Sequence, residues 1–520
     1  MATRKPARKP TAARGGASSV SGKPALPVRI RMYRQGIGDA FLVSIGPRGE
    51  QRHMLIDCGV LLGSPQAPTW ARRIARNVRE ATDGRLDVLV ATHAHWDHVS
   101  GFLQAREIFE QQMTVGEVWM GWTENKEDAQ AARSRKRIAL QAQALYRAAA
   151  QLRASPLAAS QGQADAISHV LSFLGPPEGY LQAAGGGGTQ AAMDIARGLS
   201  ARVTYREPGE RFAFPGVDGL TVHVLGPPRD EAMLGQMLGR KGKDMYELGP
   251  YAGFAAALER FASEAPGDDG AAVCEPVVDP LLPFDRRMLF TAEQAAHIAQ
   301  DAGFGPQAAA GRQAMAEVLA LYDDPACDWR RIDDSWLLSA EALALNLDNY
   351  VNNTSLVLAL ELPDGRVLLF AADAQVGNWK SWSGLSWSAT GGGASAPKVS
   401  SADLLARTVF YKVGHHGSHN ATLKEGGLDA MTHRDLVAAI PVNQQFANDK
   451  KDWDMPAPGL YQALREKTRG RILRADGEGP TATREPSGRG DGEWASFAAR
   501  VHAAPADAEG ASLYVDYVID

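Results

Sequence analysis

Three histidines and one aspartate lie close together in residues 93–98, which read His-Ala-His-Trp-Asp-His directly after an apolar run that predicts a strand. His93 and His95 are two residues apart, so on an extended backbone both rings point to the same side and can bind one ion. Asp97 and His98 follow where a helix could begin, and the turn directs them towards a second ion. The residue types favour two divalent metal ions, with zinc first and manganese or iron as alternatives.

A solvated polar loop is the alternative interpretation of this cluster, because short motifs also arise by chance. The whole chain of 520 residues contains only 12 histidines, and three of them fall within these six positions. That concentration, directly after a predicted strand, favours the metal site.

The stretch resembles the His-x-His-x-Asp-His signature of the metallo-β-lactamase-fold hydrolases, and further motifs follow in that family's order. Residues 35–43 and 54–59 resemble the opening of the hydrolase domain of the ComEC-type branch, where a Gly-Asp turn precedes a strand ending in Ile-Asp-x-Gly. Residues 353–358 and 366–373 resemble its paired strands, the second of which ends in an aspartate. Residues 410–418 contain its His-His-Gly-Ser motif. An accidental match would seldom reproduce this order.

The resemblance implies a ligand set for two metals. The first metal would be held by His93 and His95, the second by Asp97, His98 and His415, with Asp373 as the carboxylate between them.

The resemblance also assigns roles around these ligands. His415 is taken as the ligand because in related members the ligand directly follows the strand, and His416 would then face the substrate as a proton donor or phosphate contact. The reverse division of the two histidines stays open. Asp97 and His416 are the residues that we expect to take part in catalysis. Asp57 resembles the family's early aspartate, which supports the metal-binding loop through hydrogen bonds.

The sequence departs from the family in one respect, the further histidine that many members supply to the first metal. The candidates here are His169, His223 and His297, and none lies in a convincing motif. His223 alternates as a strand residue does, and the other two fall in helical-looking segments. Glu124, just after a predicted strand, is an alternative oxygen ligand. The first metal would otherwise be weakly held, or bound only together with substrate.

The resemblance implies an α/β fold, the four-layer αββα arrangement of metallo-β-lactamases, with helical insertions. Such a core needs roughly 200–250 residues, and this chain is much longer. We expect one domain over residues 28–520, with halves at about 28–228 and 340–520 and helical insertions at about 125–200 and 229–340. An insertion could cap the active site, or serve as a scaffold or dimer surface.

Composition bounds the location of the protein and its partners. Residues 1–24 carry six lysines or arginines and no acid, which is typical of a disordered basic tail. We expect a cytoplasmic protein, because no signal-peptide core and no apolar run long enough to span a membrane is apparent. Three cysteines in 520 residues form no disulfide framework, and a net charge of −5 does not favour general nucleic-acid binding.

The motifs together predict a binuclear metal-dependent hydrolase in which the metals activate a water. The ComEC-type resemblance favours a soluble phosphodiesterase or nuclease, acting on a small-molecule or nucleic-acid phosphodiester and without that protein's membrane channel. One alternative is a carbonyl-ester hydrolase such as a lactonase, because the same water could attack a carbonyl. The other is a non-catalytic binding module on the same fold.

Overall fold

The computed structural model describes residues 25–154, 158–177, 188–236, 340–388, 398–477, 491–506 and 512–520, with a few single positions between 313 and 326. The predicted tail 1–24, His297 and most of the predicted second insertion lie outside the described residues.

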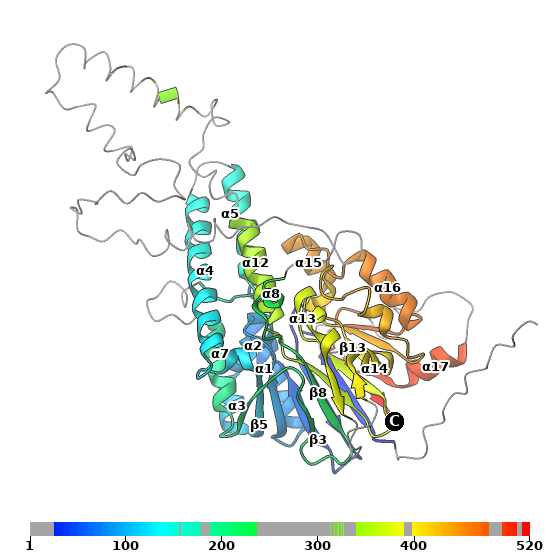
Figure 1. The fold of residues 1–520 in the computed structure, drawn as a ribbon. Coiled ribbons are helices and arrows are strands. Elements are labelled where there is room, and N and C mark those ends of the chain that lie inside the picture. Colours follow the sequence, from blue (N-terminus) through cyan, green and yellow to red (C-terminus); the bar gives the residue numbers. More distant parts are fainter. Residues whose placement is uncertain are drawn as a thin grey trace, which may run out of the picture.

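Two large β-sheets form the centre of the molecule (Figure 1). The first has the strand order β16-β17-β1-β2-β3-β4-β5-β6. Its strands are β1 (Val28–Tyr33), β2 (Phe41–Ile45), β3 (Arg52–Ile56), β4 (Arg85–Ala91), β5 (Thr114–Gly121), β6 (Val203–Arg206), β16 (Val501–Ala503) and β17 (Tyr514–Ile519).

The second sheet has the order β15-β14-β13-β10-β9-β8-β7. Its strands are β7 (Arg211–Ala213), β8 (Thr221–Gly226), β9 (Val357–Glu361), β10 (Val367–Phe370), β13 (Thr408–Lys412), β14 (Val437–Ile440) and β15 (Ile472–Arg474). A separate hairpin pairs β11 (Ser386–Ser388) with β12 (Lys398–Ser400). The two halves of the chain exchange strands, because β7 and β8 join the second sheet while β16 and β17 return to the first.

Helices cover the outer face of each sheet, and the apolar side chains sort into matching layers. One core cluster lies between the sheets and includes Val88, Val90, Leu358 and Phe410. A second joins the first sheet to α1 (Ala67–Ala81), α2 (Trp96–Gln104), α3 (Arg106–Gln112) and α7 (Gly188–Gly198). A third joins the second sheet to α13 (Val376–Ser381), α14 (Ser401–Ala406), α15 (Gln444–Lys451) and α16 (Pro458–Thr468). These layers confirm the predicted αββα fold.

Helix α1 illustrates why the covering helices form where they do. Its buried residues Ala67, Ala71, Ile74, Ala75 and Val78 recur every three or four positions, which places them on one face of a helix. A proline in the first turn suits the helix start, since its missing N–H has no partner there anyway. The helix therefore packs one apolar stripe on the first sheet.

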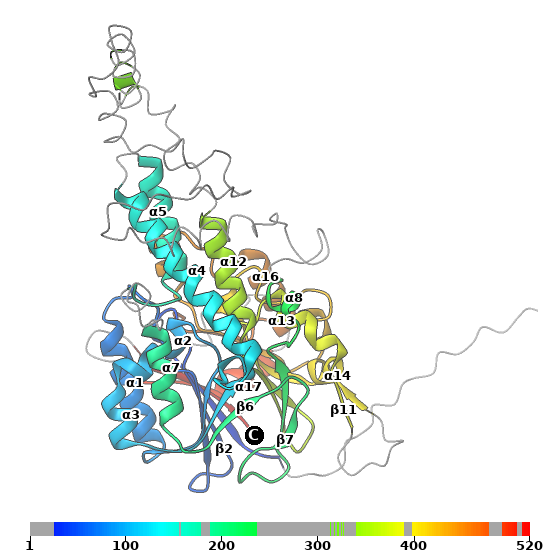
Figure 2. The same cartoon turned by 60° about the vertical axis from the view of Figure 1, so that its left-hand side comes forward.

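Three helices extend away from the sandwich (Figures 1 and 2). They are α4 (Ala129–Ala154), α5 (Ala158–Leu171) and α12 (Ala340–Asn353), and they share a small apolar core of their own. Helices α4 and α5 follow β5, so they agree with the predicted helical additions, and α12 leads directly into β9.

The remaining short elements are α8 (Glu231–Leu234), α17 (Asp491–Ala499), η1 (Trp122–Glu124), η5 (Trp382–Gly384), η6 (His415–Gly417) and η7 (Leu428–Ala430). Among the described residues, none of the helices combines the length and the apolar character needed to cross a membrane.

Candidate metal centre

The predicted metal ligands follow strands that run in the same direction. In the first sheet β3 is parallel to β4, and in the second sheet β10 is parallel to β13. The carboxyl ends of parallel strands meet at one edge of a sheet, so the loops after these strands converge. Asp57 follows β3, the His93–His98 motif follows β4, Asp373 follows β10 and His415 and His416 follow β13.

Four buried side chains converge most closely. Asp39, His98, Asp373 and His416 each offer one ligand atom, and these atoms all lie within 4.8 Å of one another. Nε2 of His98 is 3.0 Å from Oδ2 of Asp373, without the alignment of a hydrogen bond. Nε2 of His416 is 3.7 Å from the same oxygen and 2.7 Å from Oδ2 of Asp97. Of the two adjacent histidines, the structure brings His416 into this group.

His93 and His95 form a second pair beside the group. Nε2 of His93 is 3.2 Å from Nδ1 of His95, and the His93 ring is centred 4.2 Å from that of His98. Two nitrogens on one tetrahedral zinc, each about 2.0–2.1 Å from the ion, would be separated by about 3.3 Å. The observed spacing therefore suits two ligands of a common ion.

Asp57 holds the loop that carries the motif. Its carboxylate accepts hydrogen bonds from the backbone N–H of Thr92 at 2.8 Å, from the Thr92 hydroxyl at 2.7 Å and from Nδ1 of His98 at 2.7 Å. When the ring of His98 is neutral, its proton is therefore on Nδ1, and the lone pair of Nε2 faces Asp373. These three hydrogen bonds are consistent with the predicted role of Asp57 in supporting the loop.

His415 lies beside this group. Its neutral ring carries the proton on Nε2, whereas the neutral ring of His98 carries it on Nδ1. Its Nδ1 accepts a hydrogen bond from Nε2 of Gln375 at 2.9 Å, and Asn420 orients that amide by donating to its oxygen at 2.8 Å. Ser418 lies 3.0 Å from the same ring nitrogen. The proton of His415 is therefore on Nε2, which is buried and has no hydrogen-bond partner among the described residues.

Asp39 and Lys412 belong to the centre but were not predicted as site residues. The buried ammonium of Lys412 pairs with Asp39, lies 3.0 Å from Oδ1 of Asp373 and donates to the carbonyl of Ala372 at 2.7 Å. Asp373 also accepts the backbone N–H of His415 at 2.9 Å. Both contacts hold one oxygen of Asp373 and leave the other to face His98. A lysine ending an otherwise apolar strand was the sequence signal for this residue.

The residues considered as additional ligands of the first metal lie elsewhere, as far as the described residues show. His223 is buried on β8, where its Nε2 lies 2.8 Å from Glu361. Glu124 is buried in η1, 4.0 Å from Arg197. His169 is partly exposed on α5. None of the three is among the described side chains that converge at the candidate metal centre.

The charges of the centre shift the pKa values of its side chains strongly. Burial lowers the pKa of His95 to about 4 and that of His415 to about 3, so both rings are neutral near pH 7. Burial opposes the charged form of His98 as well, but Asp373 and Asp39 raise its pKa well above the usual value. Burial would raise the pKa of Asp373, yet His98 and Lys412 hold it well below its usual range.

The backbone around the centre is tightly packed and strained. A Cβ atom on Gly59 would collide with the backbone carbonyl of Asp97, so only glycine allows this close approach. Ala372, His415 and His416 have φ angles of 47°, 39° and 52°, in the left-handed region that side chains other than glycine rarely adopt. Such strain persists where the surrounding structure enforces it, and it is common at functional sites.

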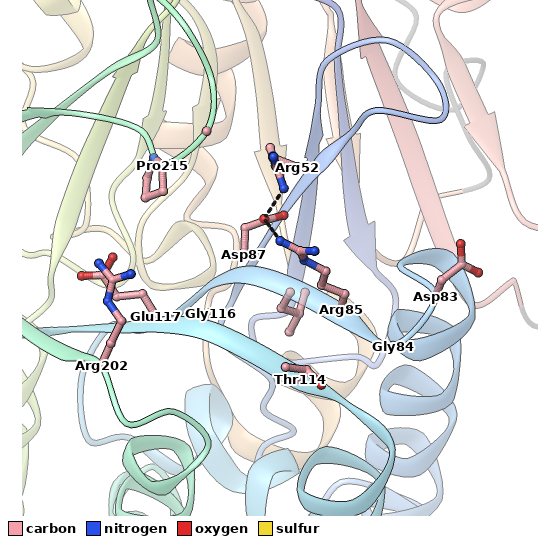
Figure 3. Close-up of a pocket in the computed structure, with 12 residues that line it drawn as sticks. Arg52, Asp83, Gly84, Arg85, Asp87, Thr114, Gly116, Glu117, Arg202 and Pro215 are labelled. Carbon is pink, nitrogen blue, oxygen red and sulfur yellow. Dashed lines mark hydrogen bonds and ion pairs between the residues drawn. The ribbon is translucent and has the colours of Figure 1, made fainter.

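A surface pocket lies at the opposite edge of the first sheet (Figure 3). It is lined by residues at the starts of β4 and β5, whereas the His93–His98 motif of the candidate metal centre follows the end of β4. Asp87 pairs there with Arg52 at 3.1 Å and lies 3.6 Å from Arg85. The pocket is therefore separate from the candidate metal centre.

The polar atoms of the centre fit a divalent cation. Within the described part of the chain, Oδ1 of Asp97, Nε2 of His98 and Oδ2 of Asp373 are buried without a hydrogen-bond partner. Leaving such atoms unpaired is costly, whereas a cation bound between them would satisfy all three. Imidazole nitrogens and carboxylate oxygens are suitable zinc ligands.

Comparison with known proteins identifies the family of the segment that carries the first motif. No curated protein matches the chain. The family model of the metallo-beta-lactamase superfamily, whose members are mostly metal-dependent hydrolases, matches residues 33–216, which include Asp39, Asp57 and the His93–His98 motif. Residues 33–216 are therefore a metallo-beta-lactamase superfamily domain.

Proposed function

We propose that the protein is a binuclear metal-dependent phosphodiesterase, with zinc as the favoured metal. In this proposal the first metal is held by His93 and His95, the second by Asp97, His98 and His416, and Asp373 lies between them. His416 takes the ligand position that the sequence resemblance gave to His415. The support for this exchange is that Nε2 of His416 lies near the carboxylates of Asp97 and Asp373.

The balance of buried charge is the observation that carries the proposal. The centre and its immediate surroundings contain five buried carboxyl groups and one buried ammonium: Asp39, Asp57, Asp97, Asp348, Asp373 and Lys412. Without a cation, burial raises the pKa of Asp348, and although burial opposes the charge of His98 and of His416, Asp373 raises the pKa of both. When the ligand histidines are neutral and all five carboxyl groups are ionised, as they would be around bound cations, the net charge is −4. An uncompensated buried charge is very costly. Two divalent cations would neutralise this set, and one would not.

The side chains around the bound metals would then have separate roles in the reaction. Divalent ions bound here would supply an activated water and neutralise charge on the phosphate. Asp373 is held in place by Lys412 and by the backbone of His415. Because the proton of His415 is on Nε2, this ring can donate a hydrogen bond to a substrate oxygen or to the leaving oxygen. It takes the role that was predicted for His416.

The choice of a phosphodiester rests on the resemblance of residues 410–418 to the ComEC-type His-His-Gly-Ser motif. Small-molecule diesters and nucleic acids are both candidate substrates within this class. A lactone or another carbonyl ester would use the same centre, and it is the outcome to test if diesters are not cut.

The experiment measures metal content and hydrolysis on the same samples. Bound metal per chain would be determined for the wild type and for His98→Ala, together with hydrolysis of a chromogenic phosphodiester before and after treatment with a chelator. His502→Ala is the matched control, because His502 is exposed on β16, in the same sheet but away from the centre.

We expect about two metals per chain in the wild type and the control, fewer in His98→Ala, and a parallel loss of hydrolysis on chelation. Metal binding without cleavage of the diester would reject the substrate class and direct the assay to carbonyl esters. A wild type that binds no metal would reject the enzyme in favour of a binding module.

A further inference from the structure

The ring of His95 must be held by something beyond the metal that it would bind. Its Nδ1 is the atom that lies 3.2 Å from Nε2 of His93. Nδ1 is therefore the ligand atom of His95 in the proposed site. The proton of the neutral ring is then on Nε2, and a buried N–H group needs an acceptor.

The other proposed histidine ligands all have a partner on the nitrogen that faces away from the metal. Nδ1 of His98 binds Asp57 at 2.7 Å. Nδ1 of His93 lies 3.1 Å from the Thr92 hydroxyl, which donates to Asp57 and so accepts from His93. Nδ1 of His416 donates to the carbonyl of Pro441 at 2.8 Å. Such partners fix the orientation and the tautomer of a metal-binding histidine.

For His95 the available carboxylate comes from α12. Oδ1 of Asp348 lies 3.8 Å from Nε2 of His95, and within the described residues both atoms are buried without a hydrogen-bond partner. Asp348 is only 7 % exposed. Its other oxygen accepts a hydrogen bond from Nδ2 of Asn352 at 3.0 Å, which leaves Oδ1 directed towards the histidine.

Helix α12 is well placed to hold this carboxylate. It packs beside α4 and α5 (Figure 2), and the backbone N–H of Leu356, just after the helix, donates to the carbonyl of Thr92 at 2.9 Å. Thr92 directly precedes the histidine motif. This backbone hydrogen bond thus joins the segment after α12 to the loop that carries His95.

We infer that Asp348 is a positioning residue for the first metal. When a metal is bound, the carboxylate of Asp348 would move from the observed 3.8 Å into hydrogen-bonding distance of Nε2 of His95 and keep Nδ1 directed at the ion. In this way α12 would orient His95 as Asp57 orients His98. The inference rests on the proposed metal centre. It also gives a physical reason why the first metal can be held without a further histidine in the described residues.

The competing acceptor is Asn352, whose side chain also interacts with the ring of His95. A carboxylate is the stronger acceptor for an N–H group beside a cation, because the hydrogen bond is charge-assisted. Variants of both residues therefore belong in the test.

The test uses the full chain and measures metal binding rather than turnover. Zinc affinity of each site would be measured for the wild type, Asp348→Asn, Asn352→Ala and His95→Ala. Glu341→Gln is the matched control, because Glu341 is an exposed carboxylate on the same helix. In cobalt-loaded samples, the shifted proton signals of ligand N–H groups report directly on the ring of His95, and His95→Ala assigns its signal.

We expect Asp348→Asn to weaken one of the two sites by about 10–100-fold, to leave the other unchanged and to speed the exchange of the His95 N–H proton with water. Loss of the first metal as complete as in His95→Ala would overturn the inference, because Asp348 would then be a ligand itself. Wild-type behaviour of Asp348→Asn, or an effect in Asn352→Ala alone, would overturn it while leaving the proposed function intact. A wild type that binds no metal would overturn both.

Discussion

Substitution of Asp57 by asparagine should weaken the second metal site through the tautomer of His98. The carboxylate accepts three hydrogen bonds, two from Thr92 and one from Nδ1 of His98. The amide of asparagine has one oxygen, so it cannot accept hydrogen bonds at the positions of both carboxylate oxygens. If its NH₂ group faces His98, the ring must place its proton on Nε2, which removes the lone pair needed by the metal. If the amide is turned round, its NH₂ group faces the backbone N–H of Thr92.

The magnitude follows from these contacts. One buried donor left unpaired costs about 1–3 kcal/mol of unfolding free energy without metal. Loss of a partner that orients a ligand histidine lowers metal affinity by about 10–100-fold. That factor corresponds to about 1.4–2.7 kcal/mol of binding free energy.

The assay is denaturant unfolding with and without zinc, together with zinc titration of each site. Asp87→Asn is the matched control, since Asp87 also accepts from a backbone N–H and an arginine but lies at the opposite edge of the sheet (Figure 3). We expect Asp87→Asn to lose stability and keep both zinc affinities. If Asp57→Asn also kept both affinities, the proposed link between Asp57 and the ligand tautomer would be refuted.

Three further predictions concern the scaffold. Burial would raise the pKa of Glu361, but His223 and Arg407 lower it to about 2, so its stabilising effect is present above pH 4.5 and is lost as the pH falls towards 2. Glu361→Gln should therefore flatten the acid side of a plot of unfolding free energy against pH, and an unchanged acid side would contradict this. Gly59→Ala should destabilise the fold by about 1–3 kcal/mol or more, whereas Gly459→Ala, with open space at its Cβ position, should not; equal thermal midpoints for the two would exclude the proposed collision. Lys412→Met should cost about 3–5 kcal/mol in urea unfolding without metal, because it leaves buried carboxylates without their cation, and a loss under 1 kcal/mol would show that the carboxylates are not dependent on it.

The buried strands and the His93–His98 part of the site could be predicted from the sequence because each is marked by a short run of neighbouring residues. Buried strands such as β4 end in apolar runs, here residues 88–91, and the His93–His98 motif follows shortly after that run. The αββα arrangement was predicted from the resemblance of these ordered motifs to those of the metallo-β-lactamase-fold hydrolases. The structure then brings His93, His95, Asp97, His98 and Asp373 to one edge, where their role as metal ligands stays a prediction.

The remaining part of the centre depends on tertiary contacts that spacing in the sequence does not encode. Asp39 and Lys412 meet although 373 positions separate them, as their residue numbers show. His415 and His416 are two successive left-handed residues, so their side chains do not point as they would at the end of a regular strand, and it is His416 that lies in the group with Asp39, His98 and Asp373. Asp348 comes from a helix, and only the packing of α12 beside the centre reveals it.

The pairing of β1 with β17, which are far apart in the sequence, has a consequence for how the protein is synthesised. Strand β1 pairs with β17 from Val28 opposite Ile519 to Tyr33 opposite Tyr514, and the buried ion pair of Arg31 and Asp516, at 2.7 Å, joins the two strands. During synthesis one edge of β1 therefore stays open until residues 514–519 emerge, and an open strand edge favours aggregation. A protein that lacks β17 should expose this edge permanently.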